Sequence, residues 1–254
     1  MSITTQSPAK KTKKDRIFPI AMDGRDKIYM NLSIPKSQSV RRYKSNSRLK
    51  PIPLLNTIDK QRSATFISGV SGSGKSLFAR DLIRQLLKIR NSETPVILFT
   101  QTIDLDPAFE DFENLLHICI STDTSFLLIS PEDLQGKIVI FDDFETAEKN
   151  IKQYASALIK DMLTRGRKMM IDAIIITHQT QNYNFTRDII FECDSYCIFP
   201  SSNPESSRRF IETFFRQKKE TLERMVEGEH QFDFLFIHKK FPEYYIKPYE
   251  IRLL

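Results

Sequence analysis

The sequence predicts an α/β fold in which a mostly parallel sheet is covered by helices on both faces. Three observations lead to this prediction. Short apolar runs of strand length recur along the chain, segments with apolar residues at helical spacing separate them, and one junction between a strand and a helix is rich in glycine. Apolar strands that alternate with amphipathic helices are typical of parallel sheets that are buried on both faces.

The apolar runs and the periodic segments define the expected elements. Strands are expected at 64–68, 95–100, 137–141, 173–177 and 195–199. Apolar residues recur every three or four positions in 77–89 and in 148–164, which predicts amphipathic helices there. A charged helix is expected over about 205–226, followed by strand-like runs at 232–238 and 243–246. These last two runs predict a small C-terminal β addition to the main sheet.

Composition and charge divide the chain into three parts: a disordered basic tail at 1–16, an N-terminal extension at 17–59 and an α/β domain at 60–254. The extension contains one alternating segment, 27–34, which predicts a peripheral strand, and a polar stretch, 36–53, which we interpret as a connecting loop. The net charge is +6, yet the first 50 residues hold 13 Lys or Arg against 3 Asp or Glu. Such clustered positive charge favours a polyanionic partner such as nucleic acid. A solvated tail without a partner is the alternative.

The same bulk properties exclude several classes of protein. No apolar run approaches the roughly 18 to 20 residues that a membrane span needs, so stable membrane insertion is not expected. The basic, polar N-terminus lacks the apolar core of a secretion signal, so we do not expect a secreted protein. Three cysteines are an odd count in 254 residues, which argues against a disulfide framework and for a reducing compartment.

Residues 69–76 read GVSGSGKS and match the phosphate-binding pattern G-x-x-x-x-G-K-[ST] at every fixed position. The predicted phosphate-binding residues are Gly69, Val70, Ser71, Gly72, Ser73, Gly74, Lys75 and Ser76. The glycines allow the backbone N–H groups to turn inward, and the following helix presents its positive end to the anion. Lys75 would reach the outer phosphates, and the Ser76 hydroxyl would bind Mg²⁺. The segment therefore predicts a P-loop for a nucleoside triphosphate.

Two carboxylates follow the apolar strand at 137–141. In a protein with a P-loop, an acidic residue at the end of a downstream strand holds Mg²⁺, which is the predicted role of Asp142. Asp143 would then be the general base that activates the attacking water. The alternative is an ordinary transition from a strand to a turn. Together, the two acids extend the prediction from nucleotide binding to hydrolysis.

Polar residues also follow the strand at 173–177. Ligands of open α/β sheets bind at the carboxyl ends of the strands, so Gln179 is predicted to face the terminal phosphate. We interpret His178 as either a packed or an exposed histidine, or as a further polar residue of the site. Upstream, Arg165 and Arg167 lie between a predicted helix and a strand, where one of them could act on a neighbouring subunit's nucleotide. A solvated or DNA-facing surface is the alternative.

The motifs GVSGSGKS, IVIFDD, LTRGRKMMIDAIIITHQ and RDIIFECDSYCIFPSSN follow one another in this order. Their succession resembles the FtsK/HerA superfamily of P-loop ATPases, and most closely the genome-packaging ATPases of large or internal-membrane double-stranded DNA viruses. The resemblance covers about residues 60–210. Two positions depart from the family pattern. Asp142-Asp143 stands where many members have Asp-Glu, and His178 separates Thr177 from Gln179.

The resemblance implies a RecA/ASCE-like P-loop fold that binds ATP and Mg²⁺. It further implies a homo-oligomeric ring, a pentamer or a hexamer, that moves double-stranded DNA into a capsid and contacts a capsid or portal-vertex protein. Such an enzyme would act in the virion or in a viral factory in the host cell. Two alternatives share the P-loop: a small-molecule or nucleoside kinase, and an NTP-binding assembly factor.

Overall fold

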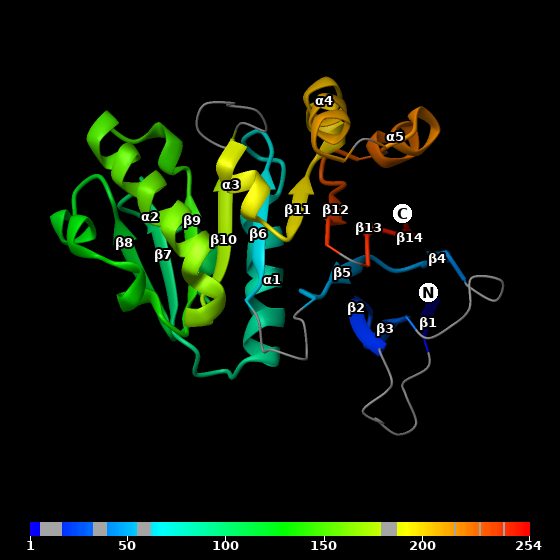
Figure 1. The fold of residues 1–254 in the computed structure, drawn as a ribbon, viewed down its shortest axis with the longest axis horizontal. Helices are drawn as coiled ribbons and strands as arrows, with labels where there is room; N and C mark the ends of the chain where they lie inside the picture. Colours follow the sequence, from blue (N-terminus) through cyan, green and yellow to red (C-terminus); the bar gives the residue numbers. More distant parts are fainter. Residues whose placement is uncertain are drawn as a thin grey trace.

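A ten-stranded sheet forms the centre of the molecule, and a four-stranded sheet packs beside it (Figure 1). The computed structural model describes residues 1–5, 17–32, 40–54, 62–178, 187–215, 217–228, 230–240 and 242–254. In spatial order the central strands are β4 (Arg42–Lys44), β14 (Glu250–Leu253), β13 (Tyr244–Lys247), β12 (Leu235–His238), β11 (Ser195–Ile198), β6 (Ala64–Ser68), β10 (Asp172–Thr177), β9 (Ile138–Asp142), β7 (Val96–Thr100) and β8 (Leu115–Cys119). The strands from β11 to β8 are parallel, and the other four are antiparallel.

The small sheet is antiparallel and comes entirely from the N-terminal part of the chain. Its spatial order is β1 (Ser2–Thr4), β3 (Asp26–Asn31), β2 (Ile17–Asp23) and β5 (Leu49–Pro51). The described residues also form five α-helices: α1 (Lys75–Ile89), α2 (Lys149–Met169), α3 (Arg187–Glu192), α4 (Pro204–Phe215) and α5 (Lys219–Val226). Among the described helices, none has both the length and the apolar character required to cross a bilayer.

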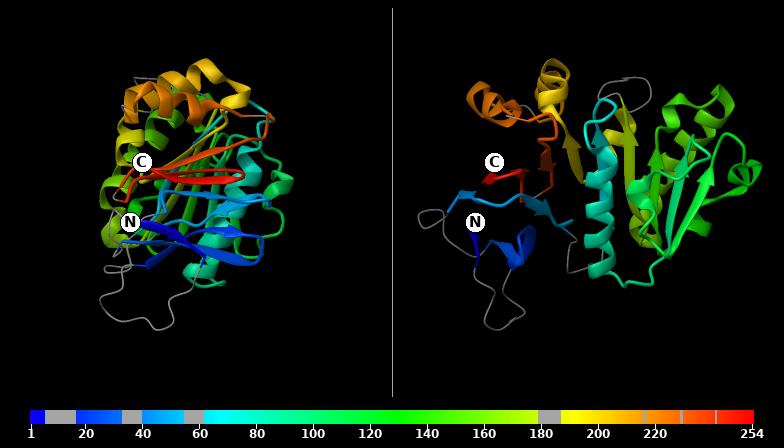
Figure 2. Two further views of the ribbon diagram at one scale, coloured as in Figure 1. Left: turned by 90° about the vertical axis from the view of Figure 1, so that its right-hand side faces the viewer. Right: turned by 180° about the vertical axis from the view of Figure 1, so that it is seen from behind.

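Alternating side chains of the central strands fill two cores, because successive residues of a strand point to opposite faces. On one face, Phe66 of β6 joins a core with residues of α2, α3, α4 and α5. On the other face, Ile67 joins a core with α1 and the small sheet. Figure 2 shows α1 and the N-terminal strands on this second face. The predicted α/β fold with helices on both faces is therefore confirmed.

Strand pairing brings three chain segments to one edge of the sheet. Parallel β10 lies between β6 and β9, and Thr177 pairs with Ser68 while Ile176 pairs with Asp142. The glycine-rich segment after β6, the acidic pair after Phe141 and the residues after Thr177 consequently lie at adjacent carboxyl ends. This is the edge at which open α/β sheets bind their ligands.

The predicted N-terminal elements were only partly right. Residues 2–4, expected within a disordered tail, form β1, and the expected loop at 36–53 contains β4 and β5. Each of these strands has three residues and pairs with a strand distant in sequence, so no local periodicity marks it. The remainder of the predicted tail, residues 6–16, lies outside the described residues.

Helix boundaries also differ from the prediction. The predicted helix at 148–164 continues to Met169 as α2, and the single charged helix at 205–226 is two helices, α4 and α5. Gly166, which as a glycine weakens a helix, lies inside α2, where a Cβ would stand 3.2 Å from Cδ of Arg62. β8 and β14 are further strands that the sequence patterns did not reveal.

Candidate active site

The P-loop connects β6 to α1 and has the backbone geometry that its glycines permit. Gly72 and Gly74 adopt left-handed φ angles of 74° and 100°, which side-chain-bearing residues rarely take. At Gly69, a Cβ would lie 2.6 Å from Oγ of Ser73 and 2.9 Å from a ring carbon of Phe199. Helix α1 begins at Lys75 with no side-chain cap and no acidic residue in its first turn. Its first N–H groups are thus available to an anion.

Lys75 reaches from the first turn of α1 toward the ends of the neighbouring strands. The side chain is largely buried, and Nζ lies 3.2 Å from the carbonyl oxygen of Val70. Burial lowers the pKa of Lys75, while the charges of Asp143, Asp142 and Glu145 oppose this shift. The ammonium group therefore faces three carboxylates, and phosphate oxygens would give it further negative partners.

Asp142 ends β9, and Asp143 follows it in the left-handed region at φ 52°. The Asp143 N–H donates to the carbonyl oxygen of Ile176 at 3.2 Å, which holds the turn against β10. Burial, followed by the charge of Asp143, raises the pKa of Asp142 to about 7, and Lys75 acts in the opposite direction. Because like charges crowd this site, a bound cation would stabilise its ionised form.

Glu145 is a third acid of this site and was not among the predicted residues. One of its oxygens accepts the backbone N–H of His178 at 2.7 Å. Burial raises the pKa of Glu145. Its other oxygen and Oδ1 of Asp143 are buried without a hydrogen-bond partner in the described part of the chain. Unpaired buried carboxylate oxygens are costly, and they are the ligands that Mg²⁺ and its water molecules prefer. Among the described residues no three such side chains form a metal site by themselves, so these oxygens fit the water shell of a Mg²⁺ ion that is also bound by phosphates.

His178 lies between the lysine and the acids. Its Nε2 is 2.6 Å from Oδ2 of Asp143, and its Nδ1 is 3.3 Å from Nζ of Lys75. The sequence left the role of this residue open between packing, exposure and the site, and the structure places it in the site. Gln179, predicted to face the terminal phosphate, lies outside the described residues.

The predicted P-loop and acid residues are thus brought together, whereas the two arginines are not. Arg165 and Arg167 belong to the last turns of α2, which leads into the amino end of β10. That is the sheet edge opposite the P-loop. Arg165 is exposed and pairs with Asp161 at 3.0 Å and with Glu132. Within one chain, neither arginine therefore lies beside the P-loop. Ser76, the other predicted Mg²⁺ ligand, is half-buried in the first turn of α1.

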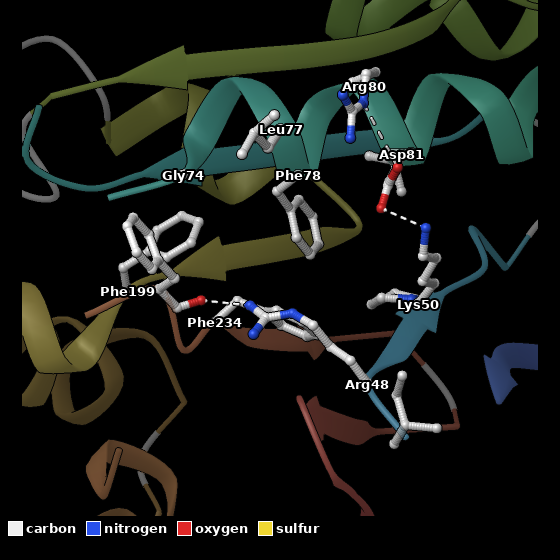
Figure 3. Close-up of a pocket in the computed structure, with 13 residues that line it drawn as sticks. Arg48, Lys50, Gly74, Leu77, Phe78, Arg80, Asp81, Phe199 and Phe234 are labelled. Carbon is white, nitrogen blue, oxygen red and sulfur yellow. Dashed lines mark hydrogen bonds and ion pairs between the residues drawn. The ribbon is translucent and has the colours of Figure 1, made fainter. Parts of the chain in front are cut away.

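A cavity of about 340 Å³ lies beside the P-loop, and Figure 3 shows the residues around it. Its lining combines the first turns of α1 with β5 and with residues that flank β11 and β12, including Arg48, Lys50, Leu77, Phe78, Phe199 and Phe232. Sequence reasoning missed this feature entirely. Its residues come from four segments that are distant in sequence, and outside the P-loop none of these segments carries a motif that would have revealed it.

Comparisons with known proteins found a sequence relative and several solved structures with a similar fold. No family model matches this chain. An uncharacterized protein, V3 of the Sputnik virophage, is 23% identical in a match 196 positions long that covers 71% of this chain and 73% of that protein. The conjugation coupling protein TcpA of pCW3, solved with ATPγS, has a TM-score of 0.52 and 14% identity, and the match covers 92% of this chain and 77% of TcpA.

Two further structures have similar scores. The cytoplasmic domain of the type VII secretion ATPase EccC from Thermomonospora curvata has a TM-score of 0.52 and 12% identity, over 91% of this chain and 28% of that one. The genome-packaging NTPase B204 of Sulfolobus turreted icosahedral virus 2 has a TM-score of 0.49 and 16% identity, over 70% of this chain and 92% of B204. TcpA and EccC confirm the predicted α/β fold.

Proposed function

We propose that this protein is a Mg²⁺-dependent ATPase that drives double-stranded DNA into a viral capsid. The observation that carries the proposal is the cluster at the carboxyl edge of the sheet. There, Lys75 of the P-loop faces Asp142, Asp143 and Glu145, and His178 connects the lysine to Asp143. A P-loop lysine beside acids with unpaired oxygens is the arrangement that phosphoryl transfer to water requires.

The chain's own residues divide the work of hydrolysis. The N–H groups of residues 69–76 and Lys75 would hold the phosphates, while Ser76 and Asp142 would hold the metal ion. Mg²⁺ would neutralise charge that develops on the phosphate oxygens. Asp143 would accept the proton of the water that attacks the terminal phosphorus, and the bond from that phosphorus to the bridging oxygen would break to give ADP and phosphate. Gln179 is retained as a further candidate for orienting this water.

DNA translocation rests on different support. The motif order resembles FtsK/HerA-type motors, and TcpA, which shares the fold, is a conjugation coupling protein. The first 50 residues carry concentrated positive charge, which favours a polyanion. The virophage relative supports a viral setting, either the virion or a viral factory. A capsid or portal-vertex protein is the expected docking partner.

We propose a ring because the two arginines predicted to act on the nucleotide do not lie beside the P-loop of their own chain. Arg165 and Arg167 lie at the edge of the sheet opposite the P-loop. A neighbouring subunit in a pentamer or hexamer would present one of them to the nucleotide, where an arginine supplied in trans stabilises the transition state.

The test is ATP turnover by the full chain with Mg²⁺, measured with and without duplex DNA. We expect hydrolysis that duplex DNA stimulates, and Asp143→Asn should reduce turnover by about 10² to 10⁴-fold while ATP still binds. Phosphate transfer to a small-molecule acceptor, with no effect of DNA, would identify a kinase instead. Wild-type biological activity of Asp143→Asn would identify an NTP-binding assembly factor.

A further inference from the structure

The cavity beside the P-loop begins at the phosphate-binding residues themselves. Gly74 of the P-loop forms part of its wall, followed along α1 by Leu77, Phe78 and Asp81. Figure 3 shows α1 on one side of the space, with Arg48 and Phe234 on the other. A ligand that has phosphates in the P-loop could therefore extend directly into the cavity.

Two aromatic side chains flank the P-loop at the mouth of the cavity. A Cβ on Gly74 would lie 3.6 Å from the Phe232 ring and 3.7 Å from the Phe199 ring, so both rings are in van der Waals range of this glycine. Phe232 is 46% exposed, and Leu77, which also lines the cavity, is 51% exposed. Both side chains are about half exposed beside the binding loop. A flat apolar group that covers them removes apolar surface from water, which favours its binding.

The N-terminal extension supplies the wall opposite α1. An Nη atom of Arg48 donates to the carbonyl oxygen of Phe232 at 2.6 Å, and the guanidinium lies 5.6 Å from the centroid of the Phe234 ring. Further along, Lys50 pairs with Asp81 of α1 at 3.1 Å. These contacts fix the segment around β5 against α1 and against the chain just before β12. Arg48 thereby holds Phe232 at the mouth of the cavity through its backbone.

We propose that this cavity binds the purine base of the nucleotide. Two segments form the base site: the N-terminal extension contributes Arg48, and the segment before β12 contributes Phe232. The inference rests on the proposed function, since it places the base of the same nucleotide that the P-loop binds. Aromatic rings and a planar guanidinium are the groups on which bases stack. The cavity volume lies in the range typical of small-ligand sites.

The proposal gives the N-terminal extension a role in nucleotide binding. Its residues 48–51 line the cavity together with α1, although more than 20 residues separate the two segments in sequence. Because stacking uses the face of the base and not its edge, the site should accept adenine and guanine with similar affinity. The P-loop and its acids, and not the base site, would then select the triphosphate.

The experiment compares two ligands, Mg-ATP and Mg-tripolyphosphate, by calorimetric titration of the full chain. Tripolyphosphate carries the phosphates without a base. Phe232→Leu and Arg48→Met should each bind ATP about tenfold more weakly and bind tripolyphosphate as the wild type does. Lys75→Ala should weaken both ligands. Phe191→Ala is the matched control, since Phe191 is an exposed phenylalanine of α3 and does not line the cavity.

The outcomes separate the base site from the proposed function. If the wild type binds both ligands and the two cavity variants bind ATP with wild-type affinity, the base lies elsewhere and only the base site is wrong. If the wild type binds neither ligand, the nucleotide function fails, and the base site fails with it. Unchanged binding of tripolyphosphate by the variants also shows that they are folded, so a selective loss of ATP affinity supports the proposal.

Discussion

The imidazole of His178 connects two residues from different motifs: its Nε2 lies 2.6 Å from Oδ2 of Asp143, and its Nδ1 lies 3.3 Å from Nζ of Lys75. One neutral tautomer satisfies both contacts, because Nδ1 can accept from the ammonium group while Nε2–H donates to the carboxylate. His178 thus holds the acid that is proposed as the general base. It does so from the position directly after Thr177, the last residue of β10, and one residue before the predicted Gln179.

Replacing His178 should separate positioning of the base from nucleotide binding. His178→Ala removes the donor to Asp143, and we expect turnover to fall by about 10 to 100-fold with the KM for ATP changed by no more than about threefold. His178→Gln keeps an N–H at similar reach and should retain more turnover than the alanine variant. Steady-state kinetics with Mg-ATP checks both variants.

The control for this substitution is His230→Ala, since His230 is exposed and takes no part in the site. It should leave turnover unchanged. Wild-type turnover by His178→Ala would show that Asp143 needs no support from the imidazole, and the positioning role would then be abandoned.

The candidate site illustrates which features of a protein can be predicted from local sequence patterns. Residues 69–76 are contiguous, and the chemistry of phosphate binding restricts nearly every position, so the P-loop was predictable from sequence alone. Asp142 and Asp143 were predictable because they follow an apolar strand. Glu145 was not recognised and the role of His178 stayed open, since their contact depends on a left-handed turn at Asp143 that brings the two residues within 2.7 Å.

The cavity and the N-terminal strands were missed for a related reason. Arg48 and Phe232 meet across 184 positions of sequence, and the contact is made by a backbone carbonyl, which has no residue-type signal. The predicted helix ended at residue 164, whereas α2 continues through Gly166 to Met169. The close approach of Gly166 to Arg62 is a tertiary contact, which no local pattern reveals.

A buried ion pair fixes the amino end of β10. Asp172 is 1% exposed. Its carboxylate accepts hydrogen bonds from Nε and Nη of Arg90 at 2.8 and 3.0 Å, and from the backbone N–H of Ser63 at 2.6 Å. Arg90→Met would leave a buried carboxylate without its counter-charge, and should lower the free energy of unfolding by about 3 to 5 kcal/mol. Urea denaturation followed by circular dichroism measures this change.

Two further variants distinguish the ion pair from the simple loss of an arginine. Asp172→Asn in the Arg90→Met background removes the buried charge and should recover part of the lost stability. Arg209→Met removes an arginine from an exposed pair with Glu205 and should have little effect. If Arg90→Met and Arg209→Met prove equally mild, the pair with Asp172 does not stabilise the sheet.

Stability should decrease in mild acid because of His238. Burial lowers the pKa of His238 to about 4, and Nδ1 lies 2.9 Å from Oγ of Ser195. The unfolded chain binds a proton at His238 below its ordinary pKa of about 6.5, whereas the folded chain does so only near pH 4. The free energy of unfolding should therefore fall between pH 6.5 and pH 4, by about 3 kcal/mol from this group.

The variant His238→Gln checks this assignment. It removes the titrating group, so its loss of stability between pH 6.5 and pH 4 should be smaller than that of the wild type by about 3 kcal/mol. Denaturation of both proteins at several pH values gives the free energy of unfolding as a function of pH. The two proteins are compared by the slope of this dependence and not by their absolute stability. Parallel slopes for the two proteins would show that His238 does not titrate on unfolding.

Arg167 is the better placed of the two predicted trans-acting arginines. Arg165 is engaged by Asp161 and Glu132, whereas Arg167 is exposed and has no ion pair within the described ranges of the chain. If Arg167 completes the site of a neighbouring subunit, Arg167→Ala should reduce ATP turnover by about 10³-fold or more with little change in ATP binding. Arg165→Ala should have a smaller effect, because its charge is already neutralised by two carboxylates.

Mixing two inactive variants tests the trans arrangement directly. A Lys75→Ala subunit has a defective P-loop but an intact Arg167, and an Arg167→Ala subunit has the opposite defect. In a mixed ring, some interfaces join an intact P-loop to an intact arginine, so turnover should reappear in the mixture although neither variant is active alone. An arginine that acts within its own subunit gives no such recovery. The recovered turnover should depend on the ratio of the two variants. It should be highest at intermediate ratios, because each active interface requires one subunit of each kind.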